Sequence, residues 1–116
     1  RIKDCIRRRG ENISAAEVEA AMMQLPGIAE VAAFPVPSTV RGGEDEVMLA
    51  LVPMPDARLT PRAIADHAHN VLPRFARPRF IELVSELPKT ATGKVQRAQL
   101  RNRGVGPATW DVEASG

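Results

Sequence analysis

The chain has 116 residues, the size of one domain, and 44% of them are hydrophobic. Three phenylalanines, one tryptophan and no tyrosine leave the core to aliphatic side chains. The single cysteine, Cys5, excludes an internal disulfide and predicts a reducing, cytoplasmic environment. The longest apolar run, 47–52, is far shorter than the about 20 residues of a membrane-spanning helix. No secretory signal opens the chain, and a start without methionine favours a C-terminal piece of a longer protein.

Charge is unevenly distributed, although the net charge is only +2. Residues 1–9 carry five cations and one acid, residues 10–72 three cations and nine acids, and residues 73–103 eight cations and two acids. If the two basic ends converge in space, they form one positive surface for an anionic partner such as a nucleotide, a coenzyme or nucleic acid. Ordinary solvated charge is the alternative, and charge alone does not decide between the two.

The first quarter of the chain predicts a short hairpin followed by a helix. Residues 1–6 and 11–13 have weak strand patterns, joined by a turn at 7–10 whose glycine can adopt positive φ. Ser14 and Glu17 form a capping box at the start of a helical pattern. This pattern predicts a helix over 15–24, with one apolar face made of Val18, Ala21, Met22 and Leu25.

Strands and helices alternate over the next part of the chain. Residues 28–34 predict a strand that ends at Pro35, and 47–52 predict a strand buried on both faces because the run is apolar without alternation. Thr60 and Pro61 begin a helix that ends before Pro73. Residues 73–79 read as a stiff basic connector.

The last third predicts a strand over 80–84, a polar loop over 85–94 and a short helix from about 95 to 101. The fold class is therefore α+β, with a small open sheet of about three strands, two or three packed helices and a preceding short hairpin. We expect the domain to span 1–103 and the tail 104–116 to fray, with docking of Trp110 as the alternative.

General catalytic motifs are absent from the sequence. His67 and His69 stand two residues apart on a predicted helix and point to different sides, so no metal site is expected. There is no Gly-x-Ser-x-Gly nucleophile motif. Thr92-Gly93-Lys94 is not a P-loop, because that motif needs Gly where Pro88 stands and Ser or Thr where Val95 stands. By itself, Lys94 is either a surface lysine or a mobile point charge for phosphate or carboxylate.

Two stretches together resemble the adenylate-forming enzymes, which include acyl-CoA synthetases, peptide-synthetase adenylation domains and luciferases. Residues 1–14, RIKDCIRRRGENIS, followed by Glu17-Val18-Glu19, resemble the family's hinge motif. Residues 88–97, PKTATGKVQR, resemble its closing lysine motif. The two motifs are separated by roughly the length of the family's C-terminal lid domain. The sequence from Gly10 to Ile13 is most similar to acyl-CoA ligases, including medium-chain and carnitine-type ones.

The resemblance implies a role for each matching residue. Lys94 would be the catalytic lysine between the substrate carboxylate and the α-phosphate of ATP, and Arg1 would contact the ribose hydroxyls. Lys3 would be the hinge between two lid positions. Gly10 would let the pantetheine arm of coenzyme A pass, with Arg7 facing the same tunnel. In this family a carboxylic acid and ATP first give acyl-AMP, and a thiol then displaces AMP.

The resemblance also implies the ligands and partners of the whole enzyme. ATP with Mg²⁺ and coenzyme A would bind mainly with a large N-terminal domain outside this chain, so we expect the fragment alone to be inactive. A small carboxylic acid would be the substrate, with no nucleic acid. Three alternatives stay open: loading of a carrier-protein thiol, a basic nucleic-acid-binding module built on Arg7–Arg9 and the 74–79 arginines, and regulation by acetylation of Lys94.

Overall fold

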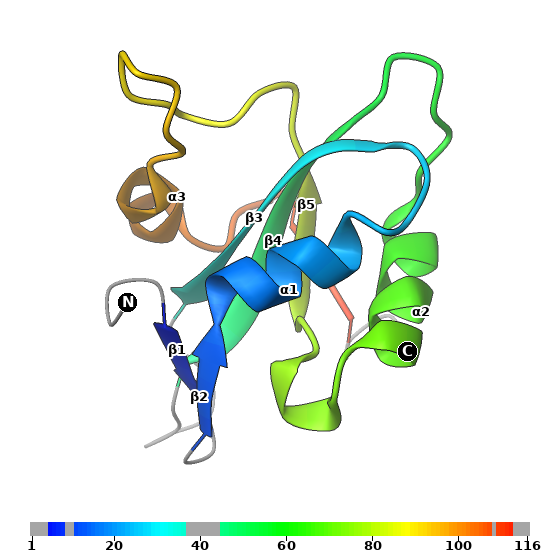
Figure 1. Cartoon of the computed structure of the whole chain (residues 1–116), viewed down its shortest axis with the longest axis vertical. Helices are drawn as coiled ribbons and strands as arrows, with labels where there is room; N and C mark the ends of the chain where they lie inside the picture. Colours follow the sequence, from blue (N-terminus) through cyan, green and yellow to red (C-terminus); the bar gives the residue numbers. More distant parts are fainter. Residues whose placement is uncertain (1–4, 9–10, 37–44, 108, 113–116) are drawn as a thin grey trace.

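The computed structural model describes residues 5–8, 11–36, 45–107 and 109–112. Two strands, β1 (Cys5–Arg8) and β2 (Glu11–Ser14), form an antiparallel hairpin ahead of the main body. The main body is a mixed sheet of four strands in the order β3-β4-β5-β6 (Figure 1). These strands are β3 (Ile28–Val36), β4 (Glu46–Pro53), β5 (Phe80–Leu83) and β6 (Trp110–Asp111). The predicted α+β class with an open sheet and a preceding hairpin is confirmed.

Three helices complete the described fold. They are α1 (Ala15–Met22), α2 (Pro61–Val71) and α3 (Arg97–Arg103), with a single 3₁₀ turn, η2 (Arg74–Ala76), inside the predicted connector. The caps at the first two helices are those expected from the sequence: Ser14 Oγ accepts from the backbone N–H of Glu17, and Thr60 Oγ1 accepts from that of Ala63. No helix among the described residues is both long and apolar enough to cross a membrane.

Strand β4 is the centre of the core and is buried on both faces, as its uninterrupted apolar run predicted. Successive side chains of a strand point to opposite faces, so β4 contributes to two separate clusters. Val47, Leu49 and Leu51 join the cluster beneath α1, α2 and the hairpin. Met48 and Ala50 join the cluster on the opposite face, which Leu87 and Leu100 of the C-terminal segment cover. The sheet is therefore the middle layer between these two coverings (Figure 1).

Several boundaries differ from the sequence-based expectation, among them the end of α1, which falls at Met22 rather than at residue 24. Strand β3 continues through Pro35 to Val36, because β3 is the edge of its sheet and an edge strand tolerates a residue without an N–H. Helix α3 begins at Arg97 rather than at Val95, and β1 includes Arg7 and Arg8, which were assigned to the turn. Residues 9–10 of that turn lie outside the described residues.

In the described part of the tail, Trp110 docks on the sheet, which was the alternative to fraying. Trp110 and Asp111 pair antiparallel with Ile81 and Phe80, which gives the sheet a fourth strand where three were expected. Both carboxylate oxygens of Asp111 lie 3.4 Å from guanidinium nitrogens of Arg79, which also lies 3.4 Å from a carboxylate oxygen of Glu46. This cluster of charged groups ties β6 to the body of the domain.

Candidate functional site

The lysine motif forms a short β-hairpin, residues 88–96, which we call the lysine hairpin. Lys89 and Val95 make an antiparallel bridge, and the N–H of Gln96 donates to the carbonyl of Pro88 over 2.8 Å. Nearer the tip, the N–H of Thr90 donates to the carbonyl of Lys94 over 2.8 Å. Val95 and the preceding Leu87 pack on the apolar cluster of the sheet, so the base of the hairpin is part of the core.

The tip is a tight turn over Thr90–Gly93. The N–H of Gly93 donates to the carbonyl of Thr90 over 2.9 Å, and Thr90 Oγ1 accepts from the N–H of Lys94 over 3.1 Å. Gly93 has φ +87°, the left-handed conformation that a three-residue hairpin loop requires at this position. A Cβ at Gly93 would meet nothing within 4 Å, so the turn needs glycine for its backbone angle and not for space.

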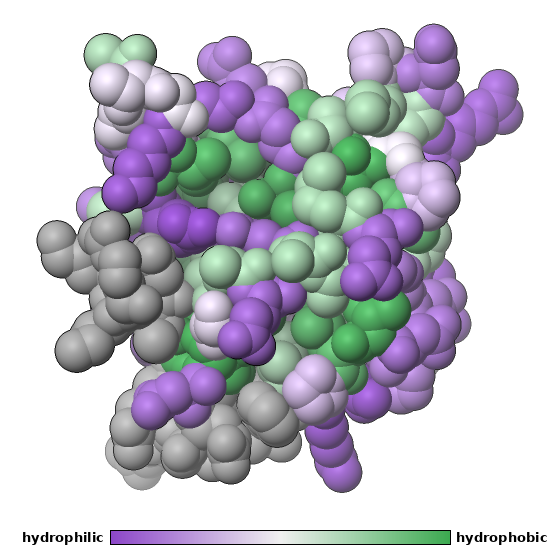
Figure 2. Space-filling view, viewed as in Figure 1, coloured by the Kyte–Doolittle hydropathy of each residue, from purple (hydrophilic) through white to green (hydrophobic). Residues whose placement is uncertain are grey.

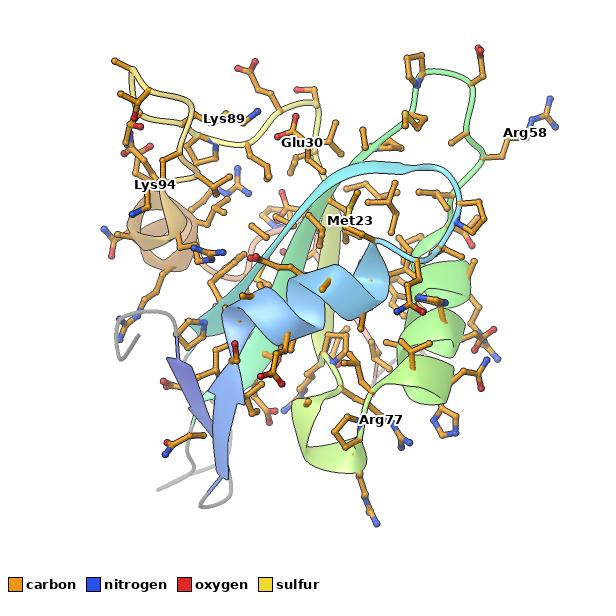
Figure 3. All side chains as sticks on the ribbon, in the orientation of Figure 1. Met23, Glu30, Arg58, Arg77, Lys89 and Lys94 are labelled. Carbon is orange, nitrogen blue, oxygen red and sulfur yellow. The ribbon has the colours of Figure 1, made fainter. Side chains whose placement is uncertain are left out.

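Lys94 is exposed and directly follows this turn. Figure 3 shows its side chain pointing away from β3, whereas Lys89, on the same hairpin, points toward β3. The tip projects from the body of the domain, and Figure 2 shows it as a mixture of hydrophilic, near-neutral and weakly hydrophobic (pale green) residues. The hairpin therefore presents an accessible ammonium group on a hydrogen-bonded support.

Lys89 ties the outer part of the hairpin to β3. Its Nζ lies 2.5 Å from a carboxylate oxygen of Glu30, and the two side chains are 38% and 37% exposed. Figure 3 shows the two groups facing each other across the space between the hairpin and the strand. Exposed pairs of this kind contribute little to stability, so this contact orients the hairpin weakly.

Arg97 ties the base of the hairpin to α1 and β3 through Glu19. Its Nη2 lies 2.6 and 2.8 Å from the two carboxylate oxygens of Glu19, and its Nε donates to Oε2 over 3.0 Å. Oε2 also accepts from the backbone N–H of Ala33 over 2.8 Å. Ala33 lies on the edge strand β3. The carboxylate of Glu19 therefore accepts a hydrogen bond from an N–H at the edge of the sheet and also binds the guanidinium of Arg97.

This contact joins the two motifs that carry the family resemblance, because Glu19 belongs to the first and Arg97 ends the second. Sequence reasoning assigned no role to either residue. The opposite charges of Glu19 and Arg97 were the only hint of this ion pair in the sequence. The two residues are 78 positions apart, and no sequence pattern pairs them.

Most of the other predicted site residues lie outside the described part of the chain. Arg1, Lys3 and Gly10 are among the residues that the structure does not describe. The backbone of Arg7 lies in β1, in register with Asn12. Strands β1 and β3 are in contact, and so are α3 and β3, so β1 and α3 both pack against β3 (Figure 1).

The two histidines lie on α2. Within the described ranges, no three His, Cys, Asp or Glu side chains lie together as metal ligands would. His67 lies 2.9 Å from the carbonyl oxygen of Ala21 through its Nε2, and the ring nitrogen is the donor. His69 is exposed. His67 thus links α2 to α1.

A polar groove of about 520 Å³ lies between the end of β5 and α3. Glu82 in this groove lies 3.5 Å from Arg103 and accepts from the hydroxyl of Thr109 over 3.0 Å. Its lining consists of Glu82, Leu83, Val84, Ser85, Glu86, Pro88, Gln99, Leu100 and Arg103. Lys94 is not part of it, so the predicted catalytic group faces outward and needs another surface to complete a site.

Comparison with known proteins identifies the family. The chain belongs to the AMP-binding enzyme C-terminal domain family, whose profile matches residues 17–94. It is 36% identical over 104 residues to bovine (Bos taurus) long-chain fatty acid transport protein 1, covering 90% of this chain and 16% of that protein. It is 36% identical over 109 residues to the human (Homo sapiens) mitochondrial acyl-coenzyme A synthetase ACSM1, covering 91% of this chain and 19% of that protein.

The fold is also similar to that of solved ligases. The crystal structure of the anthranilate CoA ligase AuaEII in complex with anthranoyl-AMP matches with a TM-score of 0.80 and 31% identity, covering 100% of this chain and 22% of that one. The chain thus spans about a fifth of the length of the proteins it matches. It is a C-terminal domain of the adenylate-forming acyl-CoA ligase superfamily, whose members use ATP and coenzyme A.

Proposed function

We propose that this domain is the mobile lid of an AMP-forming acyl-CoA synthetase and that it delivers Lys94 to an active site on a large N-terminal domain. The observation that carries the proposal is the position of Lys94, exposed at the tip of a hydrogen-bonded hairpin that projects from the domain. The cytoplasm remains the proposed location, on the strength of the single cysteine.

The chemistry of adenylation suits an accessible lysine. When a carboxylate attacks the α-phosphate of ATP, two negative groups approach each other and pyrophosphate leaves. The ammonium of Lys94 neutralises part of this charge and holds the two groups together, which requires no proton transfer. Magnesium on the phosphates supplies further neutralisation, and no described cluster of this domain is a ligand set for it.

The second half-reaction is proposed to use the other basic end of the domain. After rotation about Lys3, Gly10 and Arg7 line the path of coenzyme A, and its thiolate attacks the acyl carbonyl and releases AMP. The anthranoyl-AMP bound to one matching ligase supports acyl-AMP as the intermediate. The similarity to the acyl-coenzyme A synthetase ACSM1 supports coenzyme A as the acceptor, and the bovine relative is named for long-chain fatty acids.

Two substitutions in the full-length protein test the proposal. We expect Lys94→Ala to reduce acyl-AMP formation, measured by ATP–pyrophosphate exchange, by at least about 100-fold, which is the scale of losing one electrostatic group in the transition state. Thioester formation from supplied acyl-AMP and coenzyme A should stay near the wild-type rate. Lys3→Pro should show the opposite pattern, because proline fixes φ at the hinge. Equal losses in both half-reactions for Lys94→Ala would contradict its role.

A carrier-protein thiol is the second candidate acceptor, since adenylation domains of this superfamily load such thiols. Supplying coenzyme A and a phosphopantetheinyl carrier protein separately to the pre-formed acyl-AMP complex distinguishes the two. We expect thioester product with coenzyme A alone. Product only with the carrier protein would replace the acyl-CoA synthetase assignment.

A further inference from the structure

We propose that Glu19 and Arg97 are positioning residues that hold the lysine hairpin in the orientation required for adenylation. The inference rests on the proposed function of Lys94. It gives a functional role to an ion pair between two residues 78 positions apart in the sequence, neither of which is Lys94 itself.

The pair is built more firmly than the other ion pairs of α3 and the lysine hairpin. Two guanidinium nitrogens of Arg97 contact Glu19, in the forked geometry that fixes direction as well as distance. The side chains of Arg97 and Glu19 are 25% and 16% exposed. The backbone of Ala33 holds the same carboxylate, so the carboxylate is itself anchored to the sheet.

The Glu19–Arg97 ion pair lies where it can set the direction in which the lysine hairpin points. Arg97 is the first residue of α3 and stands three residues after Lys94, a distance of at most about 10 Å along the chain. The backbone contact between Gln96 and Pro88 at the hairpin base lies immediately before Arg97. A change in the angle at which α3 leaves the hairpin is therefore transmitted to Lys94 over a short, hydrogen-bonded support.

Small displacements at this point are costly for the reaction. Adenylation requires the ammonium to sit between two reacting groups, and a shift of about 1 Å in such a group lowers rates by about 100-fold. The thioester half-reaction, in the proposed function, does not use Lys94. Loss of the pair should therefore slow the first half-reaction selectively, whereas general damage to the domain slows both.

Glu19→Gln is the sharpest test in the full-length protein. The amide keeps the size of the side chain and an oxygen that accepts from Ala33, but it removes the charge that Arg97 requires. We expect ATP–pyrophosphate exchange to fall by about 10- to 100-fold. Thioester formation from supplied acyl-AMP should change by less than about twofold. Arg97→Gln should behave the same way, and the double variant should be no worse than either single one, because both remove one interaction.

Arg103→Gln is the matched control. Arg103 also lies on α3 and also contacts a glutamate of the sheet, Glu82, at 3.5 Å. It stands at the opposite end of the helix from the hairpin, and its side chain is 51% exposed. Both half-reactions should be unchanged in this variant.

The Lys94→Ala variant separates failure of this inference from failure of the proposed function. If Lys94→Ala loses adenylation but Glu19→Gln keeps it, only the positioning role is overturned. If Lys94→Ala itself keeps adenylation, the proposed function fails. Equal loss of both half-reactions in Glu19→Gln would reduce the pair to a purely structural contact.

If Glu19→Gln does not yield folded protein, Arg97→Lys provides a second test. It keeps the positive charge without the forked geometry and should still lower adenylation selectively. A wild-type rate of ATP–pyrophosphate exchange in Arg97→Lys would overturn the inference.

Discussion

Gly27 and Gly93 offer a matched pair of substitutions, since both have positive φ but their surroundings differ. Gly27, which follows α1, has φ +99°, and an added Cβ would lie 3.1 Å from the Cβ of Ala57 and 3.5 Å from the side chain of Leu59. Gly93, at the tip of the lysine hairpin, has φ +87° and open space around the same position. Alanine at either site therefore strains the backbone, but only alanine at Gly27 also causes a steric conflict.

The expected losses of stability follow from the backbone strain and from the crowding of the added Cβ. A left-handed non-glycine residue costs about 1–2 kcal/mol, which is the whole expected effect of Gly93→Ala. Overpacking adds about 1–3 kcal/mol, so Gly27→Ala should cost about 2–5 kcal/mol in total. Gly93→Ala should also tilt Lys94, so the full-length variant should lose adenylation more than thioester formation. Gly27→Ala should affect the two half-reactions alike.

Urea unfolding of the 116-residue chain, followed by the fluorescence of Trp110, measures the difference. Trp110 is the sole tryptophan and packs against the core beneath α1 and α2, so its emission reports unfolding. The urea concentration at the midpoint of unfolding should fall more for Gly27→Ala than for Gly93→Ala, and the dependence of the unfolding free energy on urea (the m-value) should stay unchanged. Equal losses, or a larger loss at Gly93, would refute the argument that crowding at Ala57 separates the two sites.

Two further substitutions test contacts described above. Thr60→Ala should cost about 1 kcal/mol in urea unfolding because it removes the cap on the N–H of Ala63; Thr60→Ser should keep stability, and an unaffected alanine variant would show that the cap contributes nothing. Asp111→Asn should cost about 1 kcal/mol, because its contacts to Arg79 are long and partly exposed. The Trp110 emission of this variant should shift to longer wavelength if β6 detaches, whereas unchanged emission would argue that backbone pairing alone holds the strand.

Local signals in the sequence predicted most of the elements because those elements depend on nearby residues. Thr60 with Pro61 fixed the start of α2, and the unbroken apolar run of β4 indicated burial on both faces before any neighbour was known. The short helix was expected two residues too early for a local reason as well. Val95 and Gln96 pair back to the first strand of the lysine hairpin, and this contact prevents them from joining α3.

Features that depend on distant partners were not predictable in the same way. β6 has two residues and no alternation, so only its pairing with β5 defines it as a strand. The continuation of β3 through Pro35 depends on the absence of a paired strand at its outer edge, a property of sheet order. The catalytic role of Lys94 is a prediction from its motif, whereas the ion pair between Glu19 and Arg97 could be found only in the fold, because an ion pair across 78 residues leaves no periodic pattern.

The two faces of the sheet are covered by segments that are synthesised at different times during translation. A nascent chain that ends before the lysine hairpin already contains β3, β4, β5 and the two helices of one face. Its other face, which carries Phe34 and Met48, stays partly uncovered until Leu100 emerges from the ribosome. Translation products that stop short of Lys94 therefore expose an apolar surface, and we expect chaperones and proteases to remove them. In the proposed function, completion of the fold would thereby be coupled to the presence of Lys94, and we expect truncated copies not to persist as folded lids.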